Sequence, residues 1–375
     1  MTNIEQIEQS EQSNFLLKRI ENKDTKNCAN LLKEYADEEL IKRNIPTLYI
    51  LQENDIRLTD PKLKKVYSKL NLKTIKKAKE IKSIIKKDDI LITRFDYKRI
   101  ESEVIIAAKS MSAITFTYDT SGIDIRVRAA PSHFLFAKSQ TLKNATEKKF
   151  PKHYKKIFVT GNLHCDSAIN TQVNKKEFME SYGLDPNKKL VILLPANPGE
   201  LGHQLGIDET YRNIVNIIKN QCPEYEIMIK AHPLDYTANM KSQPGIIHKN
   251  EHYKGKCSWE IFAPGIKVVK AEEGYLAIKA CDALLNVRSS IAMETALLQK
   301  PLINIDRKKY VTNWPFDSKI MIDIDLSDLA NVLNNNKYEI PDIKACKAYC
   351  IKENGFYDGT SYVRIANIIE SKYKS

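Results

Sequence analysis

The segment from Leu276 to Ile305 constrains the fold of this chain more than any other. Residues 276–281 are predicted to be helical, and the apolar run 283–287 is the length of a buried strand. A polar turn at 288–290 leads into a helix with apolar residues at 291, 293, 297 and 298. Lys300-Pro301 ends that helix, and residues 302–305 begin another strand. This order of elements predicts a parallel βαβ unit.

The turn of this unit carries groups that suit a phosphate. Ser289 and Ser290 lie where the helix begins, so either hydroxyl could cap it. The free N–H groups and the positive end of the helix dipole favour an anion there. Glu294 follows Ser290 by one turn, so a carboxylate could reach a ribose diol. An ordinary N-cap followed by a solvated glutamate explains the same residues equally well.

Two further strands in this half of the chain predict loops at the same edge. Strand 190–194 leads into loop 195–199, which contains Asn197, and strand 226–231 leads into loop 232–235. In the second loop His232 can donate to a phosphate oxygen, and Pro233 keeps His232 out of a helix. Lys230 adds positive charge, although strand alternation could turn it away. A histidine of this kind also serves as a structural hydrogen-bonding residue.

The first half of the chain shows a similar alternation. Residues 1–44 have apolar positions at helical intervals and are predicted to be helical, so the first strand expected is 47–52. Further strands are predicted at 89–93, 113–118, 133–137 and 156–159, with a helix at 102–110. Such alternation is typical of a parallel sheet, whose ligands bind beyond the carboxyl ends of the strands.

Three residues of this half are candidates for the site. Asp119 follows the strand 113–118 and could act as a general base, although an Asx turn before Gly122 would also explain it. Gly161 and Asn162 follow the strand 156–159 directly, and we assign them to nucleotide binding. The polar, helical segment 163–188 is the candidate for a linker between domains.

Residues 62–87 contain eleven lysines and one glutamate over an amphipathic apolar pattern. One interpretation is a basic helix on an anionic membrane surface. The other, which we favour, is a solvated lysine face over an ordinary core contact, because the segment has no Trp or Phe to anchor it. No apolar run is long enough to span a membrane, and the polar N-terminus lacks the pattern of a signal peptide.

The overall composition favours an anionic partner and a reducing compartment. The net charge is +12, which suits nucleotides or acidic surfaces. Seven cysteines lie without any CxxC pair, so we expect reduced, mostly buried thiols in a cytoplasmic protein. No metal spacing is found, and Asp323-Ile324-Asp325 is interpreted as a coincidental DxD near a helix N-cap. The basic segments lack interleaved aromatic residues, so nucleic acid is not an expected partner.

Four segments resemble the GT-B glycosyltransferase superfamily: VTGNLHCD at 159–166, KAHPLD at 230–235, RSSIAMETALLQKPLI at 288–303 and FYDGTSYVRIANII at 356–369. They are most similar to CDP-glycerol glycerophosphotransferases and capsule-type transferases, and their HP and SS pairs to sialyl- and Kdo-transferases. The resemblance covers residues 156–370. It implies that His232 faces the nucleotide phosphates, Ser289 and Ser290 bind phosphate, and Glu294 binds the ribose.

We therefore expect an α/β GT-B fold in which two Rossmann-like parallel-sheet domains face each other across a cleft. Residues 1–162 would form the acceptor-side domain and residues 163–375 the donor domain, with the last helix a candidate to cross back. Asp119 is the best positional match to the catalytic base of such enzymes, although YDTSG departs from the sialyltransferase pattern.

The predicted function is a metal-independent transferase without a cofactor. It would move a sugar or a polyol phosphate from a CDP-, CMP- or UDP-activated donor to a glycan or lipid-linked acceptor of a bacterial surface polysaccharide. It would work in the cytoplasm, with peripheral membrane contact through 62–87 as an open alternative. A nucleotide-sugar epimerase similar to UDP-N-acetylglucosamine 2-epimerases and a non-catalytic nucleotide-binding module are the alternatives. Turnover of the donor without an acceptor would indicate the epimerase.

Overall fold

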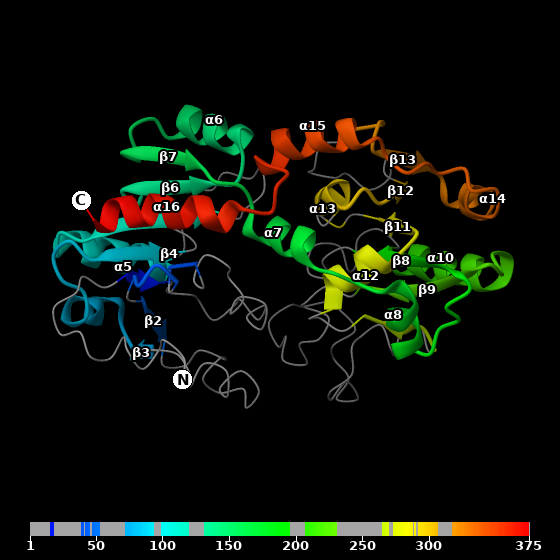
Figure 1. Ribbon diagram of the computed structural model, residues 1–375, viewed down its shortest axis with the longest axis horizontal. Helices are drawn as coiled ribbons and strands as arrows, with labels where there is room; N and C mark the ends of the chain where they lie inside the picture. Colours follow the sequence, from blue (N-terminus) through cyan, green and yellow to red (C-terminus); the bar gives the residue numbers. More distant parts are fainter. Residues whose placement is uncertain are drawn as a thin grey trace. The chain divides into compact units, whose positions relative to one another are not determined.

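The computed structural model describes residues 16–18, 39–40, 42–45, 47–52, 72–93, 99–119, 131–195, 207–230, 265–269, 273–287, 289, 292–306 and 317–374. The chain divides into two compact units, each built on its own sheet (Figure 1). Unit 1 comprises residues 1–166 and 351–375, and unit 2 comprises residues 167–350. The chain leaves unit 1 within α7 (Leu163–Asn170) and returns to it within α15 (Ile343–Asn354).

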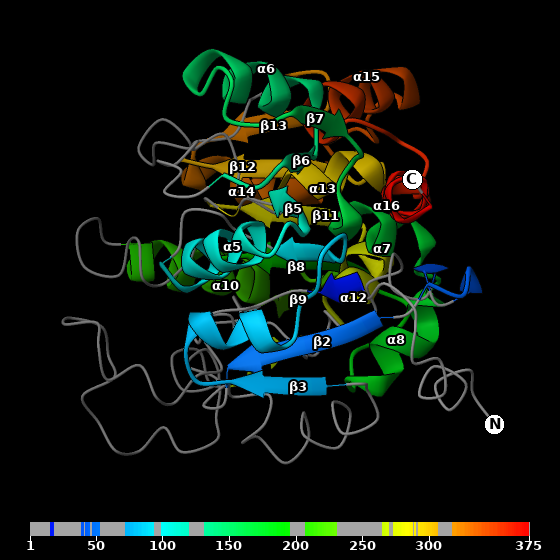
Figure 2. The same ribbon diagram turned by 90° about the vertical axis from the view of Figure 1, so that its left-hand side faces the viewer.

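Unit 1 contains a seven-stranded parallel sheet in the order β3-β2-β1-β4-β5-β6-β7, which we call sheet A (Figure 2). Its strands are β1 (Leu16–Lys18), β2 (Thr47–Gln52), β3 (Leu72–Ile75), β4 (Ile90–Thr93), β5 (Ile114–Asp119), β6 (Phe134–Ala137) and β7 (Lys156–Val159). Every strand pair is parallel, as the alternating pattern predicts.

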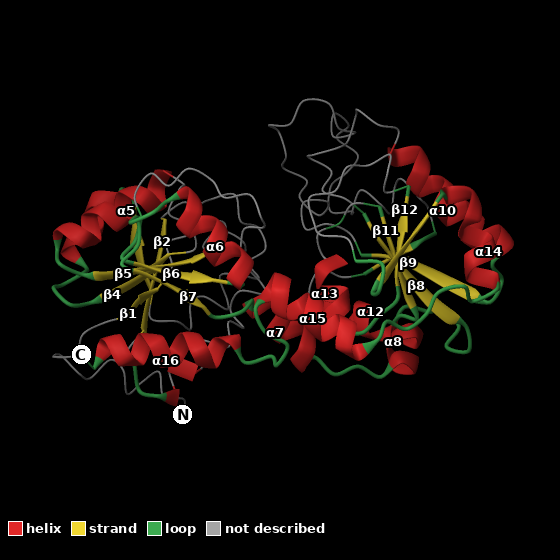
Figure 3. Cartoon of the chain, turned by 90° about the horizontal axis from the view of Figure 1, so that it is seen from above, coloured by secondary structure: helices red, strands yellow, loops and turns green. Residues whose placement is uncertain are grey.

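Helices cover both faces of sheet A (Figure 3). The helices α5 (Arg99–Ser110) and α6 (Gln140–Lys149) pack on one face, where Val104 and Leu142 are buried. The last helix, α16 (Ser361–Tyr373), packs on the other face through Ile365 and Ile369. There Phe116 and Phe136 stack with ring centroids 4.9 Å apart. The core of unit 1 therefore joins strands from the first half of the chain to its last helix.

Unit 2 contains a six-stranded parallel sheet in the order β10-β9-β8-β11-β12-β13, which we call sheet B. Its strands are β8 (Lys189–Leu194), β9 (Tyr225–Ile229), β10 (Lys267–Val268), β11 (Ala283–Asn286), β12 (Leu302–Ile305) and β13 (Met321–Ile324). The predicted βαβ unit is confirmed, because β11 and β12 pair in parallel on either side of α13 (Ala292–Leu297).

The order of strands reverses beside β8. From β8 the chain steps outward to β9 and β10, and then returns to place β11, β12 and β13 on the other side. The helix after β8, α10 (Ile207–Gln221), packs with α14 (Leu329–Asn334) on one face of the sheet. The helices α8 (Lys175–Ser181), α12 (Gly274–Ala280) and α13 lie on the other face (Figure 3). Helices that leave in opposite directions open a crevice at the carboxyl ends of the strands between them.

Two predictions of secondary structure in unit 1 are wrong. Residues 1–44 were expected to be helical, but residues 16–18 form β1, between β2 and β4. Residues 62–87 were expected to form one amphipathic helix, but residues 72–75 form β3 and residues 78–83 form the 3₁₀ helix η2 (Ala78–Ser83). A three-residue strand is too short to show a period. In the second segment, Ile75, Ala78 and Ile81 are buried at intervals of three, which a helix and a strand–turn–3₁₀ sequence satisfy alike.

The cysteines agree with the prediction as far as they are described. Cys165, Cys222, Cys281, Cys346 and Cys350 are buried free thiols. Burial raises the pKa of the Cys281 thiol to about 12 and that of Cys346 to about 11. Cys28 and Cys257 lie outside the described residues. Thiols held protonated in this way are inert core side chains.

Candidate active site

The three predicted loops start at neighbouring strands of sheet B. Loops 195–199, 232–235 and 288–290 follow β8, β9 and β11, and these strands lie in the order β9-β8-β11. Because all three strands are parallel, the loops begin at the same edge of the sheet. The reversal of strand order lies between β8 and β11. The sequence prediction thus assigned its candidate residues to the edge where such sheets bind ligands.

A row of side-chain amides crosses this edge and ends at the predicted phosphate turn. Asn286 Nδ2 donates to Asn304 Oδ1 at 2.9 Å, and Asn304 Nδ2 donates to Asp323 Oδ1 at 3.1 Å. These three residues are register partners on β11, β12 and β13. Asn286 Oδ1 accepts the backbone N–H of Ser289 at 2.7 Å. We call Asn286, Asn304 and Asp323 the amide row.

The amide row is buried at one end and exposed at the other. Asn286 and Asn304 are each 1% exposed, whereas the Asp323 side chain is exposed. Amides buried this deeply need partners, and each of the two donates to one neighbour and accepts from another. Their hydrogen bonds fix where the backbone turns after β11. Ser289 is therefore held by the sheet itself and not by the loop alone.

Lys230 lies directly beyond β9, and its stem packs on the start of α12. A Cβ atom at Gly274 would approach Lys230 Cε to 2.7 Å, so this contact depends on the absence of a side chain at Gly274. The residue before this helix, Glu273, accepts a hydrogen bond from the Tyr182 hydroxyl at 2.6 Å. The Lys230 side chain thus lies against the first residue of α12, Gly274.

The remaining candidates of this edge are only partly described. Asn197, His232, Pro233 and Ser290 lie outside the described residues. Glu294 lies in the first turn of α13, and its backbone alone is described. Of the predicted nucleotide-binding side chains in unit 2, the structure therefore places Lys230 and Ser289.

The other three candidates belong to unit 1. Asp119 is the last residue of β5, in register with Ala137 of β6, and its side chain is not described. Asn162 is 8% exposed, and its carbonyl accepts the amides of Cys165 and Asp166 in the first turn of α7. Gly161 has φ +92°, and a Cβ atom there would lie 2.2 Å from Ser361 Oγ. Gly161 and Asn162 therefore serve the packing of α7 and α16 in this structure.

Sequence reasoning missed the group of residues that binds α16 to this point. Asp166 is 2% exposed and accepts the Ser361 hydroxyl at 2.8 Å and the Tyr362 amide at 3.0 Å. Burial raises the pKa of Asp166, although both hydrogen bonds oppose the rise. Arg364 Nε donates to the Thr160 carbonyl at 2.9 Å. The sequence analysis used these C-terminal residues only as part of the 356–369 segment that resembles the GT-B superfamily.

The Arg364 guanidinium has two further partners. It donates to both carboxylate oxygens of Asp358, at 2.8 and 3.1 Å, and stacks 3.6 Å above the Phe356 ring. Burial favours the neutral form of Asp358, but the hydrogen bonds from Arg364 and Thr360 outweigh it and lower the pKa. We call Asp166, Ser361, Arg364 and Asp358 the α16 lock, because they hold the last helix on sheet A.

Comparison with protein families matches residues 2–370 to CDP-glycerol:poly(glycerophosphate) glycerophosphotransferase. The chain belongs to this glycerophosphotransferase family. The predicted resemblance is thus confirmed, and the match extends it from 156–370 to nearly the whole chain. Membership makes the protein an enzyme, a transferase that uses a nucleotide-activated donor to build a surface polymer.

Solved structures confirm the fold. A UDP-N-acetylglucosamine 2-epimerase is similar with a TM-score of 0.61 at 14% identity, covering 97% of both chains. A putative UDP-N-acetylglucosamine 2-epimerase from Listeria monocytogenes is similar with a TM-score of 0.61 at 12% identity, again covering 97% of both chains. The wall teichoic acid polymerase TagF gives 0.58 at 14% identity, covering 96% of this chain and 89% of TagF. The GT-B architecture is therefore confirmed. No curated protein matches the chain.

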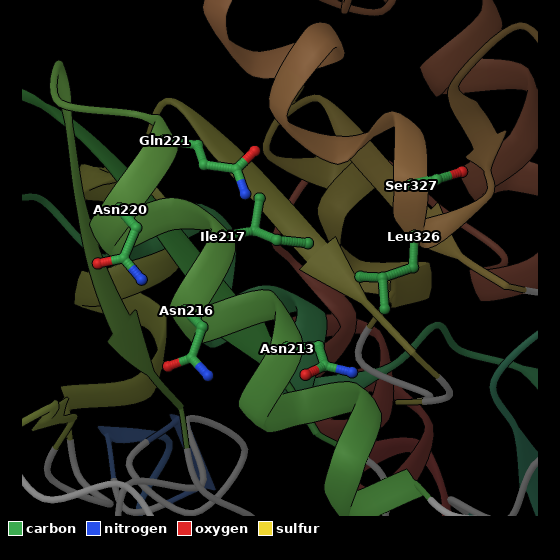
Figure 4. A pocket seen from close by; sticks show the side chains of 7 residues that line it. All are labelled: Asn213, Asn216, Ile217, Asn220, Gln221, Leu326 and Ser327. Atoms are coloured by element: carbon green, nitrogen blue, oxygen red, sulfur yellow. The ribbon is translucent and has the colours of Figure 1, made fainter.

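Features outside this edge do not add to the site of the transferase. A shallow groove of about 400 Å³ lies between α10 and the 3₁₀ helix η6 (Leu326–Asp328), on the face of sheet B opposite α13 (Figure 4). Asn213, Asn216, Asn220 and Gln221 line it from one helix, and Leu326 and Ser327 from the other. Within the described ranges, no cluster of acidic, histidine and cysteine side chains could hold a metal ion. No helix among the same residues is long and apolar enough to cross a membrane.

Proposed function

We propose that this glycerophosphotransferase takes its donor as CDP-glycerol and extends an acceptor that carries a glycerol phosphate end. The nucleotide binds at the carboxyl edge of sheet B. Ser289 and Ser290 hold its phosphates with His232, Lys230 contributes positive charge, and Glu294 holds the ribose. The observation that carries this proposal is the position of the candidate loops at the strand reversal of a family member.

In the proposed reaction an acceptor hydroxyl attacks the phosphorus that bears the glycerol. A new phosphodiester bond forms, the bond between the two donor phosphates breaks, and CMP leaves. Asp119 takes the proton of the attacking hydroxyl. Hydrogen-bond donors at the 289–290 turn and at His232 stabilise the charge that develops on the departing CMP. The amide row supports this step because it fixes the Ser289 backbone before any ligand arrives.

Calorimetry with CDP, CMP, UDP, GDP and ADP tests the donor base. We expect CDP to bind most tightly. Ser289→Ala, Ser290→Ala and His232→Ala should each weaken CDP binding about tenfold or more, the loss of one charge-assisted hydrogen bond. Ser327→Ala removes an exposed hydroxyl from the groove of Figure 4 and is the matched control. CDP binding unchanged in all three site variants would remove the site assignment.

Turnover assays separate the transferase from the epimerase alternative. Labelled CDP-glycerol should lose its glycerol phosphate only when a glycerophosphate-ended acceptor is present, with release of CMP. UDP-N-acetylglucosamine alone should be unchanged. The similarity to epimerases at 14% identity concerns the fold, so turnover of that compound without an acceptor is the result that would favour the alternative.

We also propose that the basic surface around η2 meets an anionic membrane that bears the acceptor, which is the alternative that the sequence alone did not favour. Exposed lysines occupy 73, 76, 77, 79, 82, 86 and 87, whereas Ile75, Ala78 and Ile81 face the core. Acidic side chains outside the core in this stretch are Glu80 and Asp88. Each lysine near an anionic surface contributes about 1 kcal/mol, so a K79Q/K82Q/K86Q variant should bind phosphatidylglycerol vesicles about a hundredfold more weakly. Binding that is equal on neutral vesicles would contradict this proposal.

A further inference from the structure

The groove between α10 and η6 has a lining that differs from the rest of the chain. Its volume of about 400 Å³ falls in the range of small-molecule sites, about 300–1,000 Å³. None of its seven lining residues is charged, although 28% of the residues of the chain are. Phosphates and carboxylates are bound most strongly by charged donors, which this groove does not offer. The ligand that suits such a lining is therefore uncharged.

One row of side chains on α10 faces η6. Asn213, Ile217 and Gln221 follow one another at intervals of four residues, so they share one side of the helix. Figure 4 shows this row on the side of η6, with Ile217 pointing towards Leu326. The amides of Asn213 and Gln221 lie on either side of Ile217 along the helix. The groove thus has an apolar centre between two amides.

The polar and apolar parts of the groove are both accessible. Ile217 and Leu326 pack against the core of unit 2 but are only half-buried, so part of each stays exposed. Asn213 is half-buried and Gln221 is exposed. Among the residues that the structure describes, none forms a hydrogen bond with either of these side-chain amides. Their donors and acceptors are therefore open to a ligand.

Both walls of the groove are fixed by hydrogen bonds to neighbouring elements. The Leu326 amide donates to Asp306 Oδ1 at 2.9 Å, which joins the start of η6 to the residue after β12. Asn334 Nδ2 donates to the Gln221 carbonyl at 2.8 Å, which joins α14 to the end of α10. A site whose walls are already in place costs less ordering when a ligand binds.

The chemistry of the lining matches a sugar ring. An amide offers two N–H donors and an acceptor oxygen, and a sugar hydroxyl both donates and accepts, so each pairs with the other. The C–H face of a sugar ring is apolar, so its contact with Ile217 and Leu326 removes apolar surface from water. A sugar ring therefore satisfies the amides and the apolar centre together.

We propose that the groove between α10 and η6 is an accessory site for a neutral sugar unit of the glycan on which the enzyme acts. Asn213 and Gln221 bind its hydroxyls, and Ile217 and Leu326 pack against its ring. Family membership supplies the ligand class, since the enzyme builds a surface polymer. A sugar held there keeps the chain on the enzyme between transfers and raises the effective concentration of its reactive end. The proposal does not depend on which nucleotide the enzyme uses.

Titration of the full chain with maltotetraose and with chitotetraose, followed by NMR of the ligand, tests the groove. Both probes are neutral oligosaccharides. We expect at least one to bind with a dissociation constant of about 1 mM, the affinity that a few neutral hydrogen bonds provide. The double variant Asn213→Ala/Gln221→Ala should weaken this binding about tenfold. Asn144→Ala, an exposed asparagine of α6, is the matched control and should bind like the wild type.

The same titrations contain the results that would overturn the site. The double variant should fold normally, because substitutions at such surface positions usually change stability by less than about 0.5 kcal/mol. Failure of the wild type to bind either oligosaccharide would overturn the proposal, and so would equal binding by the wild type and the double variant. Since no nucleotide is present, neither result depends on the proposed donor site. Weaker binding of sn-glycerol 3-phosphate by the double variant would make the groove an anion site and contradict a neutral ligand.

Discussion

The carboxyl edges of the two sheets are built from different chemistry. At sheet A, charged groups meet in the α16 lock, and Asp166 and Arg364 are satisfied by Ser361, Asp358 and the Thr160 carbonyl. At sheet B, the neutral amides of Asn286 and Asn304 span neighbouring strands and hold a loop amide. Charged locks resist movement of a helix on a sheet, whereas a buried amide row sets the position of one backbone turn. The first arrangement secures the fold, and the second fixes the turn of the proposed donor site.

Gly161→Ala should give the largest effect, and it tests the claim that the edge of sheet A is structural. A Cβ atom would lie 2.2 Å from Ser361 Oγ at a backbone φ of +92°. We expect the free energy of unfolding of unit 1 to fall by about 3 kcal/mol, the sum of a clash and a strained backbone. Urea denaturation monitors it.

Gly265→Ala is the matched control for this substitution. Gly265 has φ +80°, but nothing lies within 4 Å of a Cβ atom there. It should therefore cost about 1 kcal/mol, the conformational term alone. Equal losses in the two variants would mean that the contact with Ser361 contributes nothing.

Asn286→Ala breaks the amide row and should affect both stability and binding. The Ser289 amide and the Asn304 side chain would each lose a partner, at about 2 kcal/mol in stability. CDP binding should weaken about tenfold, because the 288–290 turn loses its support. Asn216→Ala, an exposed asparagine of α10 in the groove, should change neither quantity. An Asn286→Ala protein that is less stable yet binds CDP normally would make the row a purely structural feature.

His133 predicts a pH dependence that is specific to unit 1. Burial, and then the charges of Lys109 and Lys155, lower its pKa to about 4, and its Nδ1 accepts the Thr115 amide at 3.2 Å. The unfolded chain binds this proton near pH 6.5, so the free energy of unfolding should fall as the pH drops from about 6.5 towards 4. The His133→Gln variant should lose part of this slope in acid denaturation. An unchanged slope would show that the imidazole titrates normally.

Asp358→Asn should give the smallest effect. The ion pair with Arg364 is partly exposed, with 46% of the Asp358 side chain accessible. Such pairs contribute less than about 1 kcal/mol, and salt screens them. We expect a small loss of stability at low salt. The loss should disappear at about 1 M salt, where the Debye length falls to about 3 Å and exposed charges are screened. A large, salt-independent loss would mean that Asp358 acts through packing against α16.

The two units also differ in how far the sequence predicted them. In unit 2 the runs at 190–194, 283–287 and 302–305 are buried strands, and they are apolar except at Asn286 and Asn304, because burial on both faces favours a nearly continuous apolar sequence. In unit 1 the strands β1 and β3 were missed, since their pairing depends on neighbours distant in the sequence. Neither the β-strand propensity of the residues nor the hydrophobic period of the segment indicates which distant strands will pair.

The sequence predicted which loops form the candidate site, but it did not predict the amide row that holds one of them. Ser289 and Lys230 lie at the expected edge. The sequence does contain a signal for the amide row. Asn286, Asn304 and Asp323 are each the one polar residue in an otherwise apolar segment. Only the strand register aligns the three residues.

The path of the chain through α16 has a consequence for biosynthesis. Residues 167–350 form one continuous segment, whereas the core of unit 1 needs Ile365 and Ile369 beside Leu40 and Ile45. A ribosome that has released all of unit 2 has therefore not yet supplied the last layer of unit 1. Until α16 is synthesised, the apolar face around Phe116 and Phe136 stays uncovered. This face is therefore the surface that we expect chaperones of nascent chains to bind.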